Sequence, residues 1–284
     1  MDTSTARHRW LMVAAAVIIV GGLIVGYYAR RHPPGPVHTG GRWPCELRYE
    51  LGWNGLSCAS FDVRLEQSSY LGKKSLKLSY SGETLPVIDW AWQYHAAGFT
   101  YLEPGSALPR YSYRHTRVND ERKTIFARFM RAEGKIRTVS LEEGGDRESF
   151  TAQCSPGLDL QGAFLYLGRI EWKSGETRTL EVVDEDERYE VVVRRLGTET
   201  INVEGGSFDT VKVDLSLQDT GESDNDDGKS TSEKYRTIHV WFSRNAPRVP
   251  VKMRSKVFVG AVGAELTSSC CGEDCSNPEA DDGD

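Results

Sequence analysis

The chain has 284 residues, of which 39% are hydrophobic and 10% aromatic, and its formal net charge at pH 7 is −6. This aromatic content argues against wholesale disorder, and the length allows one large β domain or two small ones. A chain with a net negative charge offers no basic footprint for a phosphate backbone, so the composition argues against nucleic-acid binding.

Residues 10–28 form an uncharged run of 19 residues that begins at Trp10 and ends at Tyr28. A helix of this length matches the hydrocarbon core of a bilayer, roughly 30 Å thick, and aromatic residues at both ends suit the interfaces. We therefore predict a single transmembrane anchor at 10–28, preceded by an N-terminal stub at 1–9.

A cleaved signal peptide is the competing interpretation of this run. Its apolar core is longer than the usual span of about 7–15 residues, and no small-residue cleavage site follows it. The first cysteine is Cys45, so no lipoprotein-type cysteine follows the core directly. Arginines flank both ends of the run, so the positive-inside rule does not clearly favour either orientation of the anchor in the membrane. The short stub and the even number of cysteines favour an extracytoplasmic C-terminal side.

Residues 29–44 are interpreted as a linker, because the stretch 32–44 contains four Pro and three Gly without apolar periodicity. A β domain is expected at 45–268, and an acidic, cysteine-bearing tail at 269–284. Two segments without a basic residue, 219–228 with five acids and 273–284 with six, are interpreted as solvated loop and tail rather than as cation sites.

The first half of the domain alternates apolar and polar residues as β-strands do. Residues 47–51 alternate before Asn54-Gly55, a dipeptide typical of two-residue hairpin turns, and residues 61–65 continue the alternation. Further strands are predicted at 74–80, 87–94, 111–116, 124–130 and 134–141.

The second half begins with a helical pattern. Apolar residues at 160, 163, 164 and 167 have helical spacing, and Asp159 is suited to cap the start, so a short helix is predicted over 158–170. Strands are then predicted at 177–183, 188–194, 198–203, 208–217, 235–243, 251–259 and 264–266. Strands at hairpin spacing with one short helix predict a mainly antiparallel β fold, either an open barrel or a sandwich.

Catalytic motifs do not stand out. The sequence contains no His-Glu-x-x-His, P-loop or Gly-x-Ser-x-Gly motif, so we predict no catalytic residue, cofactor or metal site. Only His95, His115 and His239 lie where a folded site could use a histidine, and His239 is expected on the face opposite the main apolar row of its strand. Carboxylates are numerous, but the sequence cannot place two of them at the spacing that glycoside hydrolysis needs. We expect a protein without enzymatic activity.

Trp90, Trp92 and Tyr94 alternate with other residues and would share one face of a strand. Such a stripe is more often part of a core than a wall on which a ligand stacks. If the stripe lines a cavity, an apolar molecule is its natural occupant, because ligand pockets are mainly apolar.

The six cysteines are candidates either for a soft metal site or for disulfides, and disulfides are favoured because no histidine or second cysteine pair stands at zinc-finger spacing. Cys45 and Cys58 flank the first hairpin and form a natural nearby pair, although a two-residue turn would place Cys58 opposite Leu51. The disulfide candidates are Cys45, Cys58, Cys154, Cys270, Cys271 and Cys275.

A series of segments gives the domain a familiar order: Glu46-Leu47-Arg48-Tyr49, Gly52-Trp53-Asn54-Gly55-Leu56, Tyr101-Leu102-Glu103, Pro109-Arg110-Tyr111, Asp159 to Leu167, Gly206 to Val213, Val240-Trp241-Phe242-Ser243, Arg248-Val249-Pro250-Val251 and Ala264-Glu265-Leu266. Over residues 45–268 this order resembles a bacterial family of envelope proteins, domain of unknown function 3108. The acidic insert, the cysteine-bearing tail and the anchor depart from the family pattern. The resemblance implies no catalytic residues.

The resemblance implies a bacterial envelope protein, so we expect a single-pass protein of the inner membrane whose C-terminal domain is periplasmic. Three functions stay open. The domain is a non-enzymatic binding or assembly module that holds an apolar or lipid ligand or an envelope protein, a structural or interaction protein of an envelope complex, or a carboxylate-dependent envelope hydrolase.

Overall fold

The computed structural model describes residues 43–145, 147–153, 157–184, 187–218, 237–246, 248–256, 260–272 and 275. These residues form strands joined mostly by short turns, with three short helices. The strands are β1 (Cys45–Trp53), β2 (Leu56–Tyr70), β3 (Lys73–Thr84), β4 (Tyr94–Leu102), β5 (Pro109–Val118), β6 (Glu121–Met130), β7 (Lys135–Glu142), β8 (Arg147–Gln153), β9 (Thr177–Asp184), β10 (Glu187–Val203), β11 (Gly206–Gln218), β12 (Thr237–Ser243), β13 (Pro250–Lys256) and β14 (Ala261–Cys271). The helices are α2 (Pro86–Asp89), η1 (Arg131–Glu133) and α3 (Leu160–Arg169).

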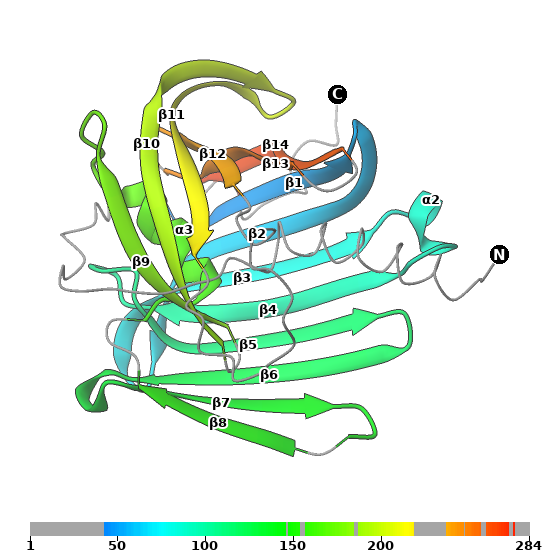
Figure 1. Ribbon diagram of the computed structural model, residues 1–284, viewed down its shortest axis with the longest axis vertical. Helices are drawn as coiled ribbons and strands as arrows, with labels where there is room; N and C mark the ends of the chain where they lie inside the picture. Colours follow the sequence, from blue (N-terminus) through cyan, green and yellow to red (C-terminus); the bar gives the residue numbers. More distant parts are fainter. Residues whose placement is uncertain are drawn as a thin grey trace, which may run out of the picture.

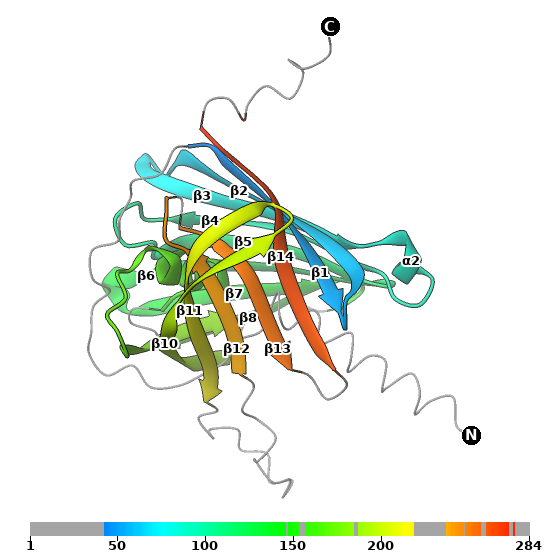
Figure 2. The same cartoon turned by 90° about the horizontal axis from the view of Figure 1, so that it is seen from above.

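Within the described residues all strands belong to one antiparallel sheet of 14 strands. Strands β8 to β1 follow one another in reverse chain order, and β14 to β9 continue the sheet beyond β1. The first and last strands of the domain are thus neighbours, while β8 and β9 form the two edges. Figures 1 and 2 show the β9–β12 part of the sheet turning away from the plane of β3–β8, with α3 lying in the angle between them. The predicted antiparallel β class is confirmed, and a single continuous sheet corresponds to the open barrel rather than to the sandwich.

The turn between β1 and β2 follows from its two residues. Asn54 and Gly55 have φ values of 51° and 85°, and positive φ at both central positions is what a type I′ hairpin turn requires. The Asn54 side chain also accepts a hydrogen bond from the backbone N–H of Ala261 at 2.8 Å, which ties the turn to the start of β14. The hairpin predicted around Asn54-Gly55 is confirmed.

Helix α3 begins where the sequence predicts it. The Asp159 carboxylate accepts a hydrogen bond from the backbone N–H of Gly162 at 2.8 Å and another from the Thr100 hydroxyl at 2.6 Å. The first bond caps the helix, and the second fastens its start to β4. Gly168, near the other end, lies so close to the carbonyl of Arg248 that any Cβ would collide with it.

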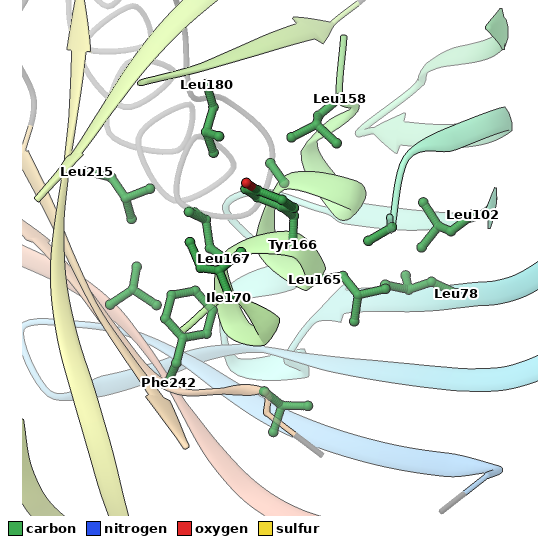
Figure 3. Packing of buried hydrophobic residues seen from close by; sticks show 14 of the residues in the cluster. Leu78, Leu102, Leu158, Leu165, Tyr166, Leu167, Ile170, Leu180, Leu215 and Phe242 are labelled. Carbon is green, nitrogen blue, oxygen red and sulfur yellow. The ribbon is translucent and has the colours of Figure 1, made fainter. Parts of the chain in front are cut away.

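The core of the domain surrounds α3. Leu165, Tyr166 and Leu167 are buried, and Figure 3 shows them between Leu78 and Leu102 on one side and Leu215 and Phe242 on the other. Burial of each large apolar side chain contributes roughly 1.5–3 kcal/mol. Helix α3 therefore fills the space between the two parts of the curved sheet and packs against both.

The strand predicted at 87–94 is wrong. Pro86 occupies the first turn of α2, and Trp90 is its C-cap residue, so the chain turns here before β4 begins at Tyr94. Proline fixes φ near −65° and has no N–H to donate, which suits the first turn of a helix and not a central strand.

Other strands also differ from the prediction, and β10, β14 and β8 show the clearest differences. The strands predicted at 188–194 and 198–203 are one 17-residue strand, β10, because the ladder absorbs the extra residue as a bulge between Arg195 and Gly197. Strand β14 runs to Cys271, well beyond the predicted 264–266. Strand β8 was not predicted, since its mostly polar residues give little apolar alternation.

The predicted anchor at 10–28 and stub at 1–9 lie outside the described residues, as do nearly all of the linker at 29–44, the acidic segment 219–228 and Cys154. No helix in the described part of the chain is long and apolar enough to cross a membrane. The domain boundaries at 45 and 268 stay predictions.

Candidate ligand-binding cavity

A cavity of about 360 Å³ lies between α3 and strands β1–β5, and residues of β13 and β14 contribute to its wall. This volume falls in the range of roughly 300–1,000 Å³ that is common for small-molecule sites. Most of the lining is apolar or aromatic. Its larger apolar side chains include Leu47, Tyr49, Leu51, Phe61, Val63, Leu65, Leu78, Tyr80, Trp92, Tyr94, Leu160, Phe164, Leu165 and Met253.

Strand alternation and two glycines create this wall. Residues two apart on β2 and β3 point to the same face, so the apolar members of both strands meet inside the curved sheet. The rings of Phe61 and Tyr80 stack with centroids 5.5 Å apart. A Cβ at Gly82 would collide with the Phe61 ring, and one at Gly98 would lie 2.7 Å from Tyr80 Cζ. Glycine at these two positions leaves room for the rings.

The polar residues of the wall are few. The described lining residues include two cations, Arg114 and Arg248, and one acid, Glu83, which stands 3.4 Å from the His95 ring. The Tyr49 hydroxyl donates to the carbonyl of Pro250 at 2.8 Å, and burial raises the pKa of this hydroxyl far above its ordinary value. Tyr49 therefore contributes a neutral, already bonded group to the cavity.

The predicted aromatic stripe is divided by the structure. Trp92 and Tyr94 line the cavity, and their rings stack with centroids 5.5 Å apart. Trp90 is 85% exposed and lies at the end of α2, so it does not share their face. Phe61 and Tyr80 are wall residues that the sequence patterns do not predict. Gly82 and Gly98, which lie inside β3 and β4, are the signal that could have indicated close approach of rings.

Two disulfides form among the described cysteines, Cys45–Cys271 and Cys270–Cys275. The suspected Cys45–Cys58 pair is wrong, because Cys45 faces Cys271 across the β1–β14 ladder. Cys58 is free and buried, and burial raises the pKa of its thiol. Cys58 donates to the carbonyl of Leu56 at 3.1 Å. Use of cysteines in disulfides is confirmed for these four residues.

The titratable groups outside the cavity form separate small clusters. His239 bonds to the buried carboxylate of Asp214, which Arg194 also contacts at 2.9 Å. His115 contacts the Thr124 hydroxyl at 2.9 Å. Within the described residues no group of three or more His, Cys, Asp or Glu is arranged to hold a metal ion.

Carboxylates also face each other across neighbouring strands, as in the pair formed by Glu181 and Glu190. Glu181 and Glu190 are cross-strand partners on β9 and β10, and Glu190 is only 8% exposed. Burial, followed by the negative charge of Glu181, raises the pKa of Glu190 to about 7. Neither residue lines the 360 Å³ cavity.

The family model "Protein of unknown function (DUF3108)" matches residues 48–267, which is more than half of the chain. The chain belongs to this family. The match confirms the family resemblance that the sequence motifs indicate, and it covers most of the cavity wall and most of β1 and β14. A search of curated proteins finds no match.

Among solved structures, the DUF3108 domain is similar to a beta-barrel-like protein of domain of unknown function DUF1849 from Brucella abortus. The TM-score is 0.54 at 8% sequence identity, over 80% of this chain and 97% of that one. At this identity the likeness shows the fold alone, and it agrees with an open, barrel-like sheet.

Two further structures match with low TM-scores. One, described as a lipoprotein from Parabacteroides distasonis, has a TM-score of 0.33 and 11% identity, over 83% of this chain and all (100%) of that one. The other, described as an exported protein with a YmcC-like fold from Bacteroides fragilis, has a TM-score of 0.31 and 9% identity, over 87% and 99% of the two chains. Likenesses at this level support no argument about this chain.

Proposed function

We propose that this protein is a non-enzymatic binding module of the bacterial cell envelope, and that its cavity holds an apolar molecule such as the acyl chain of a lipid. The observation that carries the proposal is the 360 Å³ cavity, whose wall is mostly apolar. Apolar surface gains free energy when it leaves water, at roughly 25 cal/mol per Å². A cavity with such a wall therefore favours an apolar occupant over water.

The location belongs to the same proposal. The uncharged run at 10–28 would tether the domain to the inner membrane, close to a source of lipid. Two disulfides in one domain support the periplasm, because disulfides persist in oxidising compartments and are rare in the cytosol.

A photoreactive lipid with a diazirine on its acyl chain tests the proposal on the full-length protein in membranes. We expect crosslinks on cavity residues of β1–β4 and α3 in addition to any on residues 10–28. Crosslinks confined to residues 10–28 would contradict the proposal that the cavity binds lipid.

Two neighbouring alanines provide a matched pair of variants. Ala96 lines the cavity, whereas Ala97, the next residue of β4, is exposed on the opposite face. Ala96→Leu should fill part of the cavity, reduce crosslinking several-fold and raise the free energy of unfolding by about 0.5–2 kcal/mol. Ala97→Leu adds the same atoms outside the cavity and should leave crosslinking unchanged. Equal crosslinking in the two variants would contradict the proposal.

A second candidate function, an interaction protein of an envelope complex, has support from the outer face of the sheet. On β4, Phe99 and Tyr101 alternate with the buried Thr100 and Leu102, so they lie on the face opposite the core. Their rings form a connected aromatic surface, in which Tyr70 stacks on Tyr101 at 5.1 Å. The members of this surface are Tyr70, Phe99, Tyr101, Tyr111, Tyr113 and Phe126.

Aromatic side chains are enriched at protein interfaces, so this half-buried aromatic surface favours a protein partner. Co-purification of one stoichiometric protein, lost on Tyr101→Ser but kept on Ala96→Leu, would support this second candidate. The third possibility, a carboxylate-dependent hydrolase, gains no support from the cavity, because Glu83 is the one acid among its described lining residues.

A further inference from the structure

A second pocket, of about 530 Å³, adjoins the C-terminal end of α3. Residues of β10, β11 and the end of β12 line it together with the loop that leads to β13. Unlike the apolar cavity, this pocket is rich in charged groups. Three arginines, Arg195, Arg244 and Arg248, line it with two acids, Glu171 and Asp209. We refer to it as the arginine pocket.

Among the described residues, Arg248 alone lines both the apolar cavity and the arginine pocket. Its position is fixed by the backbone around it. The N–H of Val249 donates to the Ser243 hydroxyl at 3.1 Å, and the N–H of Ser243 donates to the carbonyl of Val249 at 2.9 Å. Gly168 of α3 packs directly against the Arg248 carbonyl. The backbone of Arg248 is thus held where the two spaces adjoin, and the residue lines both of them.

Among the described lining residues of the arginine pocket, arginines outnumber acids by three to two. Neither Arg248 nor Arg244 forms a side-chain hydrogen bond or ion pair with any residue of the described chain, and the buried Nε of Arg195 has no hydrogen-bond partner there. Nη1 of Arg195 donates to the carbonyl of Trp172 at 3.3 Å. Asp209, one of the two acids, accepts the Thr200 hydroxyl at 2.7 Å.

A buried donor without a partner costs free energy, so the pocket favours a ligand that accepts hydrogen bonds and carries negative charge. The planar guanidinium group pairs in a bidentate manner with carboxylate and phosphate. The neighbouring cavity offers a compartment for an apolar chain. The two spaces together therefore match a molecule with one apolar and one anionic end.

We propose that the ligand is an anionic amphiphile, whose acyl chain occupies the apolar cavity and whose carboxylate or phosphate head group lies against Arg248, with Arg195 and Arg244 completing the arginine pocket. This inference rests on the proposed lipid-binding function and names the chemical class of its ligand. A neutral lipid of the same chain length would fill the cavity and leave the arginines without an anionic partner.

Competition with the photoreactive lipid tests the head group on the full-length protein. The competitors are oleate, oleoyl lysophosphatidic acid and oleyl alcohol, which share one chain and differ in the head group. We expect both anionic competitors to act at concentrations about tenfold or more below that of the alcohol, because hydrogen bonds to charged groups are strong. If oleate competes at a lower concentration than oleoyl lysophosphatidic acid, the ligand carries a carboxylate. The reverse order indicates a phosphate.

Arg248→Gln should reduce the advantage of the anionic competitors over oleyl alcohol about tenfold. Arg254→Gln, on an exposed residue of β13 outside both spaces, removes the same charge and should leave that advantage intact. Equal competition by all three molecules, or an unchanged advantage in Arg248→Gln, would overturn the anionic head group while leaving lipid binding standing. A lack of cavity crosslinking with every probe would overturn both proposals.

Discussion

Cys45 and Cys271 lie opposite each other in the register of β1 and β14, and their disulfide joins the first and last strands of the domain. The two cysteines are 226 residues apart in sequence, whereas Cys270 and Cys275 are separated by 5. The entropy lost by closing a loop in the unfolded chain grows with loop length. The first disulfide therefore restricts the unfolded chain much more than the second.

Removal of the two disulfides should have unequal effects on stability. The chain-entropy relation gives about 5 kcal/mol for the long loop and about 2 kcal/mol for the short one. We expect the double variant Cys45→Ser/Cys271→Ser to lose about 3–5 kcal/mol of unfolding free energy, measured by urea denaturation, and Cys270→Ser/Cys275→Ser to lose about 1–2 kcal/mol. A larger loss in the second variant would contradict this account.

The parts of the fold that the sequence predicts depend on local signals. Asn54-Gly55 predicts its hairpin because both residues accept positive φ, and Asp159 predicts the start of α3 because its carboxylate can reach the backbone three residues on. The antiparallel class follows from alternation repeated at hairpin spacing. Each of these signals can be read from residues that are close together in the sequence.

The parts that the sequence does not predict depend on contacts between distant residues. Cys58 lies nearer to Cys45 in sequence than Cys271 does, so only the pairing of β1 with β14 identifies the true partner. The segment that begins at Arg248 contributes to the family resemblance but does not indicate a wall residue, because that role arises from the packing of its loop on α3. Alternation groups Trp90 with Trp92, but Pro86 begins α2, which stands in place of the strand that alternation predicts.

Gly168 is expected to be essential for the junction between α3 and the loop at Arg248. A Cβ at this position would collide with the carbonyl of Arg248 and would lie 3.1 Å from the Phe242 ring. Backbone cannot yield as a flexible side chain can, so Gly168→Ala should lower the unfolding free energy by about 1–3 kcal/mol, despite the better helix propensity of alanine. Thermal and urea denaturation measure the change.

Gly197 provides the matched control for this substitution. It lies on β10, and a Cβ there would meet no atom within 4 Å. Gly197→Ala should therefore change stability by less than about 0.5 kcal/mol. If Gly168→Ala lowers the unfolding free energy no more than Gly197→Ala does, the close contact between α3 and the loop at Arg248 does not contribute to stability.

The pair Glu190 and Glu181 predicts a pH dependence of stability. The pKa of Glu190 is about 7 in the folded protein, against an ordinary value of 4.5, because burial and then the charge of Glu181 disfavour its ionised form. Between these two values the folded state keeps a proton that the unfolded chain has released. The folded state binds more protons in this window, so the unfolding free energy falls as pH rises from about 4.5 to 7.

Glu190→Gln removes this titration and should flatten the dependence. The difference in unfolding free energy between the variant and the wild type, measured in urea from pH 4 to 8, should shift in favour of the variant by at most about 3 kcal/mol across the window. Glu199→Gln serves as the control. A hydrogen bond from the Trp241 indole lowers the pKa of Glu199, so ionisation of Glu199 affects the unfolding free energy only at pH values near and below its ordinary pKa. Its difference from the wild type should stay constant above pH 5 and change only on acidification. A Glu190→Gln difference that does not vary with pH would show that Glu190 ionises in the folded protein as it does in the unfolded chain.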